Sequence, residues 1–359
     1  MKLAKKFTSV LLAAMLFAFT ATGCTGNNQG GAASSEAGQP EVSSSLAESS
    51  EASSEPSSAP AEKTQIRIAA IKGPTGLGML KLMSDAETGG AANDYQFELV
   101  SDPNEVVAKI STGEIDAAAV PTNLAATLYN KTEGNVQLAA LNTLGVLYIV
   151  TNGEEIASVE DLKGKTIYSS GQGSVPEYAL NYILQANGLE PGKDVMVEYK
   201  TEHTELASLL IAGDISLAML PEPFVTQVTA KNPEIKVVLD MTEEWDKAVD
   251  SKSVLTMGCV IVRKDFAEKN QEAFNKFLEE YQASVAYTNE ETEAASKLSE
   301  QFDIMPAAVA QKAIPNCNIV YLDGAEMKEK VADFLNVLFE ANPKSIGGKL
   351  PGEDFYYAK

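Results

Sequence analysis

One stretch of the chain occurs twice, about a hundred residues apart. Residues 108–121 read AKISTGEIDAAAVP and residues 209–221 read LLIAGDISLAMLP, so each copy joins an apolar helix end, a glycine, a short apolar run and a proline. Gly113 and Gly213 stand where the end of a helix favours a left-handed residue, and the apolar run after each glycine predicts a buried strand. Two equivalent α/β units predict two similar lobes with a ligand cleft between them. One large α/β domain with a chance repeat is the alternative.

The rest of the chain follows the same alternation of strands and helices, which is typical of parallel sheets with crossover helices. The chain is expected to leave the first lobe near Val150 and to return near Leu255, which makes a two-strand hinge. The predicted first lobe is therefore residues 64–150 plus 255–359, with several helices after residue 265, and the predicted second lobe is residues 151–254. Strands are expected at 66–71, 95–100, 115–120, 137–142, 146–151, 166–169, 195–199, 215–220, 235–240, 255–262 and 319–322.

The first 23 residues are typical of a secretory signal peptide. Lys2, Lys5 and Lys6 precede an apolar run at residues 10–19, which is too short for a comfortable transmembrane helix. Small residues then precede Cys24 in an arrangement that resembles the lipobox of bacterial lipoproteins. This resemblance implies cleavage before Cys24 and a diacylglyceryl thioether on its sulfur; the alternative is an ordinary signal peptide followed by a chance cysteine.

Residues 24–63 are predicted to be a flexible tether that begins with the lipidated cysteine. Ser, Ala, Gly, Glu and Pro dominate this segment, so it has too little apolar surface to offset the entropy lost on folding. The expected arrangement is a folded body of residues 64–359 held by a lipid anchor on the extracytoplasmic face of the cell membrane.

Charge and cysteine usage exclude several classes of function. The formal charge of −22 argues against nucleic-acid binding, which requires a basic surface. Cys259 lies within one predicted strand and Cys317 just before another; buried free thiols are the simpler interpretation, although an extracytoplasmic location would also permit a disulfide. Neither cysteine has the spacing of a metal or redox motif, and no cofactor is expected.

Three motifs give a resemblance to a known family. Residues 161–167 (DLKGKTI), the pair Gly173-Ser174 and residues 188–195 (GLEPGKDV) resemble solute-binding lipoproteins of ABC importers, in the branch that binds alkanesulfonates, taurine, nitrate or thiamine-precursor pyrimidines. The resemblance covers residues 66–338. It implies a two-lobed α/β fold of the type II periplasmic-binding class with C-terminal helices, a small-molecule ligand, permease subunits as partners and a monomeric state.

Ligands of α/β sheets bind outside the carboxyl ends of the strands, which selects a small set of candidate residues. A glycine-rich turn at residues 73–78 offers bare N–H groups, and Glu222 would favour an amine or amide N–H on the ligand. Each candidate also has a structural alternative: a tight turn, a helix cap or an exposed loop. The predicted ligand-binding residues are Thr75, Gly76, Thr122, Asn123, Asn142, Gly173, Ser174 and Glu222.

The two arginines of the chain, Arg67 and Arg263, do not fall at these strand ends. An anionic ligand would therefore depend on N–H groups and hydroxyls, whereas a neutral or cationic ligand could use Glu222. We favour a small neutral ring that contains nitrogen.

The single histidine, His203, is expected to be a surface or capping residue, and no motif of a catalytic site is present, so the chain is predicted not to be an enzyme. A ligand-sensing surface lipoprotein without a transporter, or an enzyme on the same fold, are the alternatives. A neighbouring permease gene would exclude the first, and turnover would indicate the second.

Overall fold

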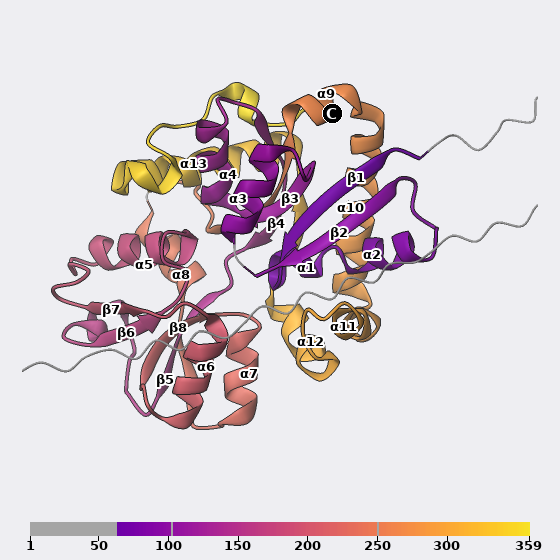
Figure 1. The fold of residues 1–359 in the computed structure, drawn as a ribbon. Helices are drawn as coiled ribbons and strands as arrows, with labels where there is room; N and C mark the ends of the chain where they lie inside the picture. Colours follow the sequence, from indigo (N-terminus) through magenta and orange to yellow (C-terminus); the bar gives the residue numbers. More distant parts are fainter. Residues whose placement is uncertain (1–62, 102, 250) are drawn as a thin grey trace, which may run out of the picture. The chain divides into compact units, whose positions relative to one another are not determined.

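The structure is a computed structural model that describes residues 63–101, 103–249 and 251–359. The predicted signal peptide, Cys24 and nearly all of the predicted tether lie outside the described residues. In the described part, the strands form two separate sheets (Figure 1).

The first sheet has six strands in the order β11-β4-β10-β3-β1-β2, and the second has five in the order β7-β6-β8-β5-β9. The bounds of the strands are β1 Gln65–Ile71, β2 Asp94–Val100, β3 Ala117–Pro121, β4 Val136–Leu144, β5 Leu147–Asn152, β6 Thr166–Ser169, β7 Met196–Tyr199, β8 Leu217–Pro221, β9 Ile235–Asp240, β10 Thr256–Arg263 and β11 Ile319–Leu322. Each predicted strand overlaps one of these.

Both sheets are mixed rather than parallel throughout, which differs from the expectation. In the first sheet β1 runs parallel to β2 and β3, but β10 runs antiparallel to β3 and β4. In the second sheet β6 is parallel to β7 and β8, but β5 is antiparallel to β8 and β9. The physical reason is connectivity: β5 and β10 each enter their sheet from the segment that joins the two sheets, so they run away from the carboxyl ends of the parallel strands.

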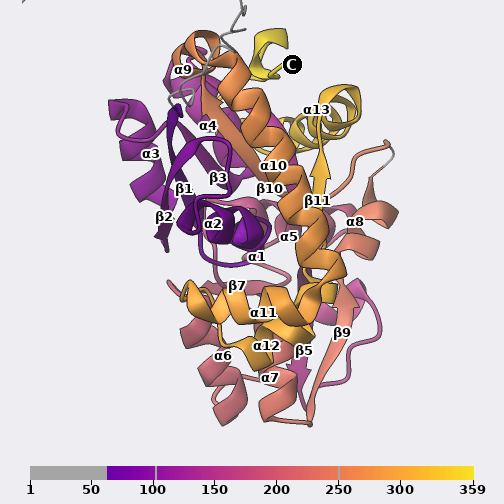
Figure 2. The same cartoon turned by 90° about the vertical axis from the view of Figure 1, so that its right-hand side faces the viewer.

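Helices cover the sheets (Figures 1 and 2). Their bounds are α1 Pro74–Leu77, α2 Leu80–Glu87, α3 Pro103–Thr112, α4 Thr122–Lys131, α5 Val175–Ala186, α6 His203–Ala212, α7 Phe224–Lys231, α8 Met241–Ala248, α9 Lys264–Lys269, α10 Gln271–Glu290, α11 Thr292–Gln301, α12 Ala307–Ala313 and α13 Gly324–Ala341. None of the helices in the described part is long and apolar enough to span a bilayer. Figure 2 shows α12 next to α7, and the two helices are in contact, so the C-terminal segment reaches the second sheet.

Two features of the helices were not predicted. The segment after β1 forms two successive helices, because the chain turns at Gly78 and Met79 between α1 and α2. Helix α8 was missed because residues 241–248 are mostly polar; its buried Trp245 anchors it, and Asp240 caps it by accepting a hydrogen bond from the Thr242 N–H at 2.8 Å.

The repeated stretch has the predicted local structure in both copies. Gly113 has φ of 76° and Gly213 has φ of 80°, so both are left-handed as a helix end requires. The strands that follow, β3 and β8, are buried. Cys259 and Cys317 are buried free thiols, which confirms the simpler of the two interpretations of these cysteines.

Both arginines bind one carboxylate at the amino end of β3. Asp116 is 3% exposed, and its Oδ1 lies 2.6 Å from Arg67 Nη2 and 3.6 Å from Arg263 Nη1. Arg67 also donates a hydrogen bond to the Asp116 carboxylate through Nε, at 2.9 Å. Because β3 is five residues long, this cluster lies roughly 16 Å from the carboxyl end of the strand.

The chain first passes from one sheet to the other at residues 145–146, between β4 and β5. The boundary expected at Val150 falls inside β5, which pairs only with strands of the second sheet, and the lobe boundaries stay a prediction. Two side chains hold the crossing: Asn318 Nδ2 donates to the Gly145 carbonyl at 3.2 Å, and Thr242 packs against the Gly145 Cα. A Cβ at this position would lie 2.1 Å from Thr242 Oγ1, so only glycine fits.

We expect the Gly145→Ala variant to lose about 1–3 kcal/mol of unfolding free energy, since the added methyl group must push α8 away from the crossing. Urea denaturation would measure this loss. The matched control is Gly90→Ala, an exposed position where a Cβ has its nearest neighbour at 3.7 Å, and it should change stability by no more than about 0.5 kcal/mol. Equal effects of the two substitutions would contradict the role given to Gly145.

Candidate functional site

The register of the first sheet brings the ends of several strands to one edge. Gly258 of β10 is opposite both Pro121 of β3 and Thr143 of β4, and Ile319 of β11 is also opposite Thr143. The carboxyl ends of β3 and β4 therefore lie beside the amino ends of β10 and β11. We call this row the first edge; the loop that follows β1 belongs to it, because Ala70 is opposite Ala119.

The second sheet has a corresponding row, which we call the second edge. Leu147 of β5 is opposite Pro221 of β8, and Tyr148 is opposite Asp240 of β9. On the other side of β8 lies β6, whose Ser169 is opposite Tyr199 of β7. Because the chain runs from Thr143 straight to Leu147, the two edges start at most about 14 Å apart.

Three of the predicted residues lie together at the first edge: Thr75, Gly76 and Asn142. Asn142 is fully buried, and its Nδ2 donates to the Thr75 carbonyl at 3.4 Å. A Cβ on Gly258 would be 2.4 Å from Thr75 Cγ2 and 2.5 Å from Asn142 Oδ1, so this glycine makes the close packing possible. Gly76 is equally confined, since a Cβ there would lie 3.0 Å from the Ile71 carbonyl oxygen.

Thr122 and Asn123 begin α4 at the same edge but do not cap it. The N-cap residue is Pro121, and the helix has no side-chain capping bond. Asn123 is 2% exposed, and its Nδ2 donates to Ser345 O at 3.1 Å and to Gly173 O at 3.4 Å. Asn123 thus connects the first edge with the loop after β6 at the second edge, whereas its Oδ1 has no hydrogen-bond partner among the described residues.

The loop that contains Gly173 and Ser174 is shaped by its own side chains. Ser174 is the N-cap residue of α5, as its capping alternative predicted, but its Oγ donates to Gly171 O at 2.9 Å and caps no N–H of the helix. The exposed Gly173 N–H instead donates to Glu177 Oε2 at 2.5 Å. A carboxylate of the chain therefore already occupies this N–H group.

Glu222 follows β8 and is 4% exposed, so the alternative of an exposed loop residue is wrong. Its backbone N–H donates to Val146 O at 2.9 Å, which ties it to the crossing between the sheets. Its carboxylate accepts hydrogen bonds from Thr226, from the N–H at 3.1 Å and from Oγ1 at 3.0 Å. Burial raises the pKa of Glu222, and no described Lys or Arg forms an ion pair with it.

Sequence reasoning missed a pair of residues at the second edge. Ser170, buried just after β6, is hydrogen-bonded to Nδ1 of His203, the first residue of α6. The His203 ring also packs against Phe224 at 5.1 Å between centroids, and burial lowers the pKa of His203 to about 4. His203 is therefore a half-buried, packed side chain, and the N-cap residue of α6 is Glu202, so the capping expectation is wrong. The position of His203 shortly after β7, a strand that pairs with β6, was the signal that could have identified this pair.

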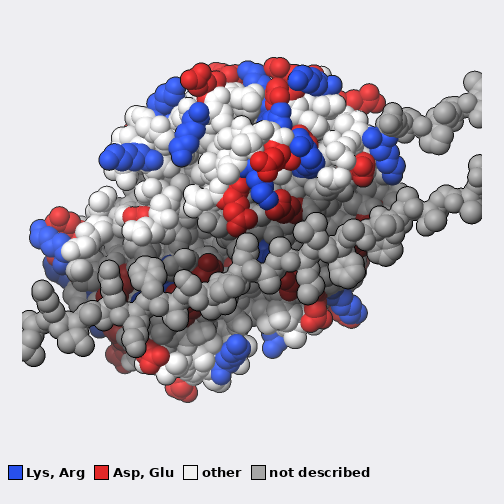
Figure 3. Space-filling model, in the orientation of Figure 1, with Lys and Arg blue, Asp and Glu red and all other residues white. Residues whose placement is uncertain are grey.

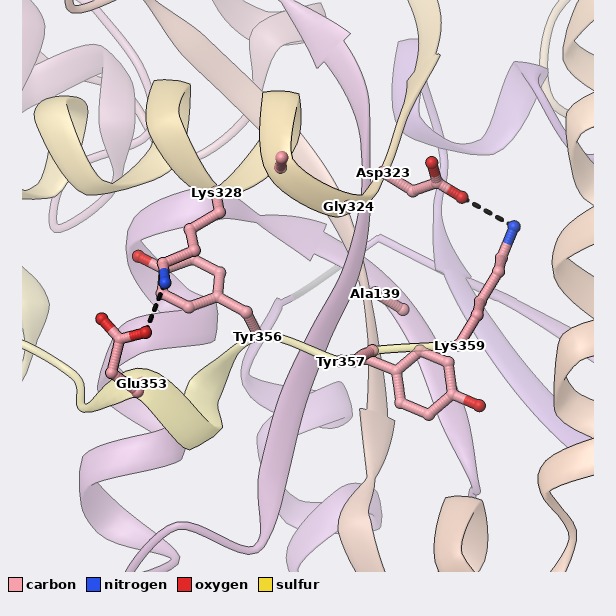
Figure 4. A pocket seen from close by; sticks show the side chains of 10 residues that line it. Ala139, Asp323, Gly324, Lys328, Glu353, Tyr356, Tyr357 and Lys359 are labelled. Carbon is pink, nitrogen blue, oxygen red and sulfur yellow. Dashed lines mark hydrogen bonds and ion pairs between the residues drawn. The ribbon is translucent and has the colours of Figure 1, made fainter.

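A cavity of about 440 Å³ lies elsewhere and is lined by none of the predicted residues (Figure 4). The end of the chain and the start of α13 form it, and its charges are paired: Lys359 with Asp323 at 2.7 Å, and Lys328 with Glu353. No group of three or more His, Cys, Asp or Glu in the described ranges could hold a metal ion. On the face in Figure 3, acidic and basic side chains are interspersed over the upper part of the molecule.

Comparisons with known proteins identify the family and the fold. The sequence model of a family described as "ABC transporter, phosphonate, periplasmic substrate-binding protein" matches residues 86–313. No curated protein matches the chain in a sequence search.

Several solved structures share the fold. An ABC transporter protein from Parabacteroides distasonis is 24% identical, with a TM-score of 0.70 over 83% of this chain and 100% of that chain. The aliphatic sulphonate-binding protein SsuA of Escherichia coli is 16% identical, with a TM-score of 0.66 over 83% and 93%. The alkanesulfonate-binding protein SsuA of Xanthomonas axonopodis pv. citri, solved with MOPS, is 15% identical, with a TM-score of 0.62 over 78% and 94%.

These neighbours confirm the periplasmic-binding-protein fold, and they include the sulfonate-binding proteins of the branch that the sequence motifs resemble. The matched residues of the family model make up more than half of the chain. The chain belongs to the family of periplasmic substrate-binding proteins of phosphonate-type ABC transporters.

Proposed function

We propose that the chain is a lipid-anchored solute-binding protein that captures one small molecule between its two lobes and delivers it to the permease of an ABC importer. The family supports the transport role, and the sequence around Cys24 supports the anchor. The ligand would contact the first edge and the second edge together. The predicted residues Thr75, Gly76, Thr122, Asn123, Asn142, Gly173, Ser174 and Glu222 all belong to these edges or to the loops that follow them.

The observation that carries this proposal is the bridge made by Asn123. Its amide group reaches the loop after β6 from the start of α4, which directly follows β3, so one buried side chain touches both places where an α/β sheet offers a ligand site. Relative movement of the two edges would change the surroundings of the unpaired Asn123 Oδ1. A ligand with a proton to donate can satisfy this oxygen, which links binding to closure of the lobes.

The Ser170–His203 pair is the one observation that favours an enzyme as a second candidate. A serine beside a neutral histidine can act as a nucleophile with its base. Incubating the protein with each ligand found in a binding screen, and following product formation, separates the two functions: a binding protein takes up ligand in stoichiometric amount and converts none.

We expect Asn123→Ala to weaken binding of the first ligand found at least tenfold, and to cost about 1 kcal/mol of unfolding free energy because two hydrogen bonds are lost. A thermal-shift screen of residues 63–359 with sulfonates, phosphonates, nitrate, amines and pyrimidines would find the ligand, and calorimetry would give the two dissociation constants.

The matched control for this substitution is Asn130→Ala. Asn130 lies on the same helix and donates to the same C-terminal tail, at 2.8 Å to Ile346 O and 2.7 Å to Lys349 O, but it is not at the first edge. It should cost similar stability and leave the dissociation constant unchanged. If both variants bind as the unmodified protein does, the edges are not the ligand site.

The Cys24→Ala variant should move the protein from the membrane fraction of its host to the soluble fraction, because the lipid would have no sulfur to join. Fractionation followed by immunoblotting measures this distribution. Cys317→Ala removes a buried thiol instead and should leave the protein in the membrane fraction. Membrane association of Cys24→Ala would contradict the anchor.

His203 should make the folded protein less stable in mild acid. Its pKa is about 4 in the folded state and near 6.5 when exposed, so below pH 6.5 the unfolded chain binds the additional proton. The stability contributed by neutral His203 is therefore complete above pH 6.5 and is lost as the pH falls toward 4. The melting temperature of the His203→Gln variant should fall less between pH 7 and pH 5 than that of the unmodified protein. An equal fall in both proteins would show that His203 is accessible to solvent.

A further inference from the structure

The most unusual group at the two edges is the carboxylate of Glu222. It is 4% exposed and shares no ion pair with a described cation. Thr226 supplies two hydrogen bonds, whereas an ionised carboxylate offers about four acceptor positions. A buried negative charge without a counter-ion is costly, so a fold that keeps one gains most from a ligand that supplies the positive charge.

The titratable groups around Glu222 add negative charge, and the positive end of α7, through the Thr226 N–H, is the only partial positive charge that contacts it among the described residues. The pKa of Tyr148 is raised to about 12 by burial and by the nearby carboxylates of Asp240, Glu222 and Glu243. The pKa of Cys317, on the opposite edge, is raised by burial and by Glu222. Glu222 therefore acts electrostatically on both edges at once.

The basic side chains close to the edges are already engaged. Arg67 and Arg263 bind Asp116 at the far end of β3. Lys72, just after β1, pairs with Asp303 at 3.1 Å, and Lys200, just after β7, lies over the Tyr168 ring at 5.6 Å from its centroid. An anionic ligand would thus have to share a cation that already has a partner in the chain.

The neutral groups of the edges point to the same kind of ligand. The Gly173 N–H, a natural donor to an anion at the start of α5, is occupied by the Glu177 carboxylate. Asn123 is 2% exposed, and its Oδ1, a hydrogen-bond acceptor, has no partner among the described residues. One donor group is therefore closed by a negative charge, and the free amide oxygen of Asn123 can only accept hydrogen bonds, whereas the Thr122 hydroxyl can donate or accept.

We propose, resting on the function proposed above, that the ligand is a small organic cation with N–H groups, an ammonium, amidinium or guanidinium, that donates hydrogen bonds to Glu222. A phosphonate or sulfonate would meet a carboxylate at Glu222 and another at Glu177, with no free guanidinium to balance them. The site of this chain thereby selects against the ligand class in the description of its family.

The test compares cations with anions on the unmodified protein and on Glu222→Gln. The cationic probes are primary amines and guanidines led by putrescine and agmatine, with choline as a cation that has no N–H; the anionic probes are methylphosphonate and ethanesulfonate. We expect a probe with N–H groups to raise the melting temperature, choline and the anions to do so less or not at all, and Glu222→Gln to weaken the bound cation at least tenfold.

A second readout needs no ligand. Because the Glu222 carboxyl group is buried without a cation, ligand-free Glu222→Gln should melt at the same temperature as the unmodified protein or higher. The matched control is Glu154→Gln, which removes a carboxylate just after β5 that forms an ion pair with Lys165 at 2.6 Å. This control should lower the melting temperature and leave the dissociation constant of the ligand unchanged.

The outcomes separate the two proposals. Binding of an anion that survives in Glu222→Gln overturns the cationic ligand but leaves the binding function standing. A clear fall in the melting temperature of ligand-free Glu222→Gln overturns it as well, since the carboxylate would then be a structural partner of Thr226. If no cationic probe raises the melting temperature, the proposed ligand class is overturned. If no cationic or anionic probe raises it, the proposed function is overturned too.

Discussion

The passage of the chain between the two sheets is the constraint on which the arrangement depends. Only residues 145–146 separate β4 from β5, so the edge of one sheet is connected directly to the edge of the other. Thr242 packs against Gly145, and Asn318, which is distant in the sequence, donates a hydrogen bond to the Gly145 carbonyl. The Glu222 N–H donates to the carbonyl of the next residue, Val146. The predicted ligand residues gather around this passage because it fixes which strand ends can meet.

The sequence predicted much of this fold for an identifiable reason. Strands with continuous apolar runs, such as 115–120 and 215–220, carry a strong local signal, and left-handed glycines mark where the preceding helices end. The directions of β5 and β10 could not be read in the same way, because an apolar run has no polarity and the pairing partner is distant in the sequence. Helix α8 escaped notice because one buried Trp245 stabilises an otherwise polar segment.

The candidate site was only partly accessible to sequence reasoning. Position after a strand is a local property, and it selected Asn142, Asn123 and Glu222 without knowledge of their neighbours. Other features of the site depend on tertiary structure. The hydrogen bond between Ser170 and His203, the hydrogen bond from the Gly173 N–H to Glu177, and the absence of a described cation beside Glu222 follow from where the helices begin relative to the strand ends. Charge balance at a site follows from such contacts, so it becomes visible only with the fold.

The C-terminal tail supports the first edge although the two are remote from each other in sequence. Ser345 and Gly173 share the amide of Asn123, and Asn130 holds the next turn of the tail through the carbonyls of Ile346 and Lys349. The start of α4 is thus supported from outside by a segment more than 200 residues further along the chain. These tail residues belong to no strand of either sheet, so local opening of the tail would remove the support of the first edge while both sheets stay paired.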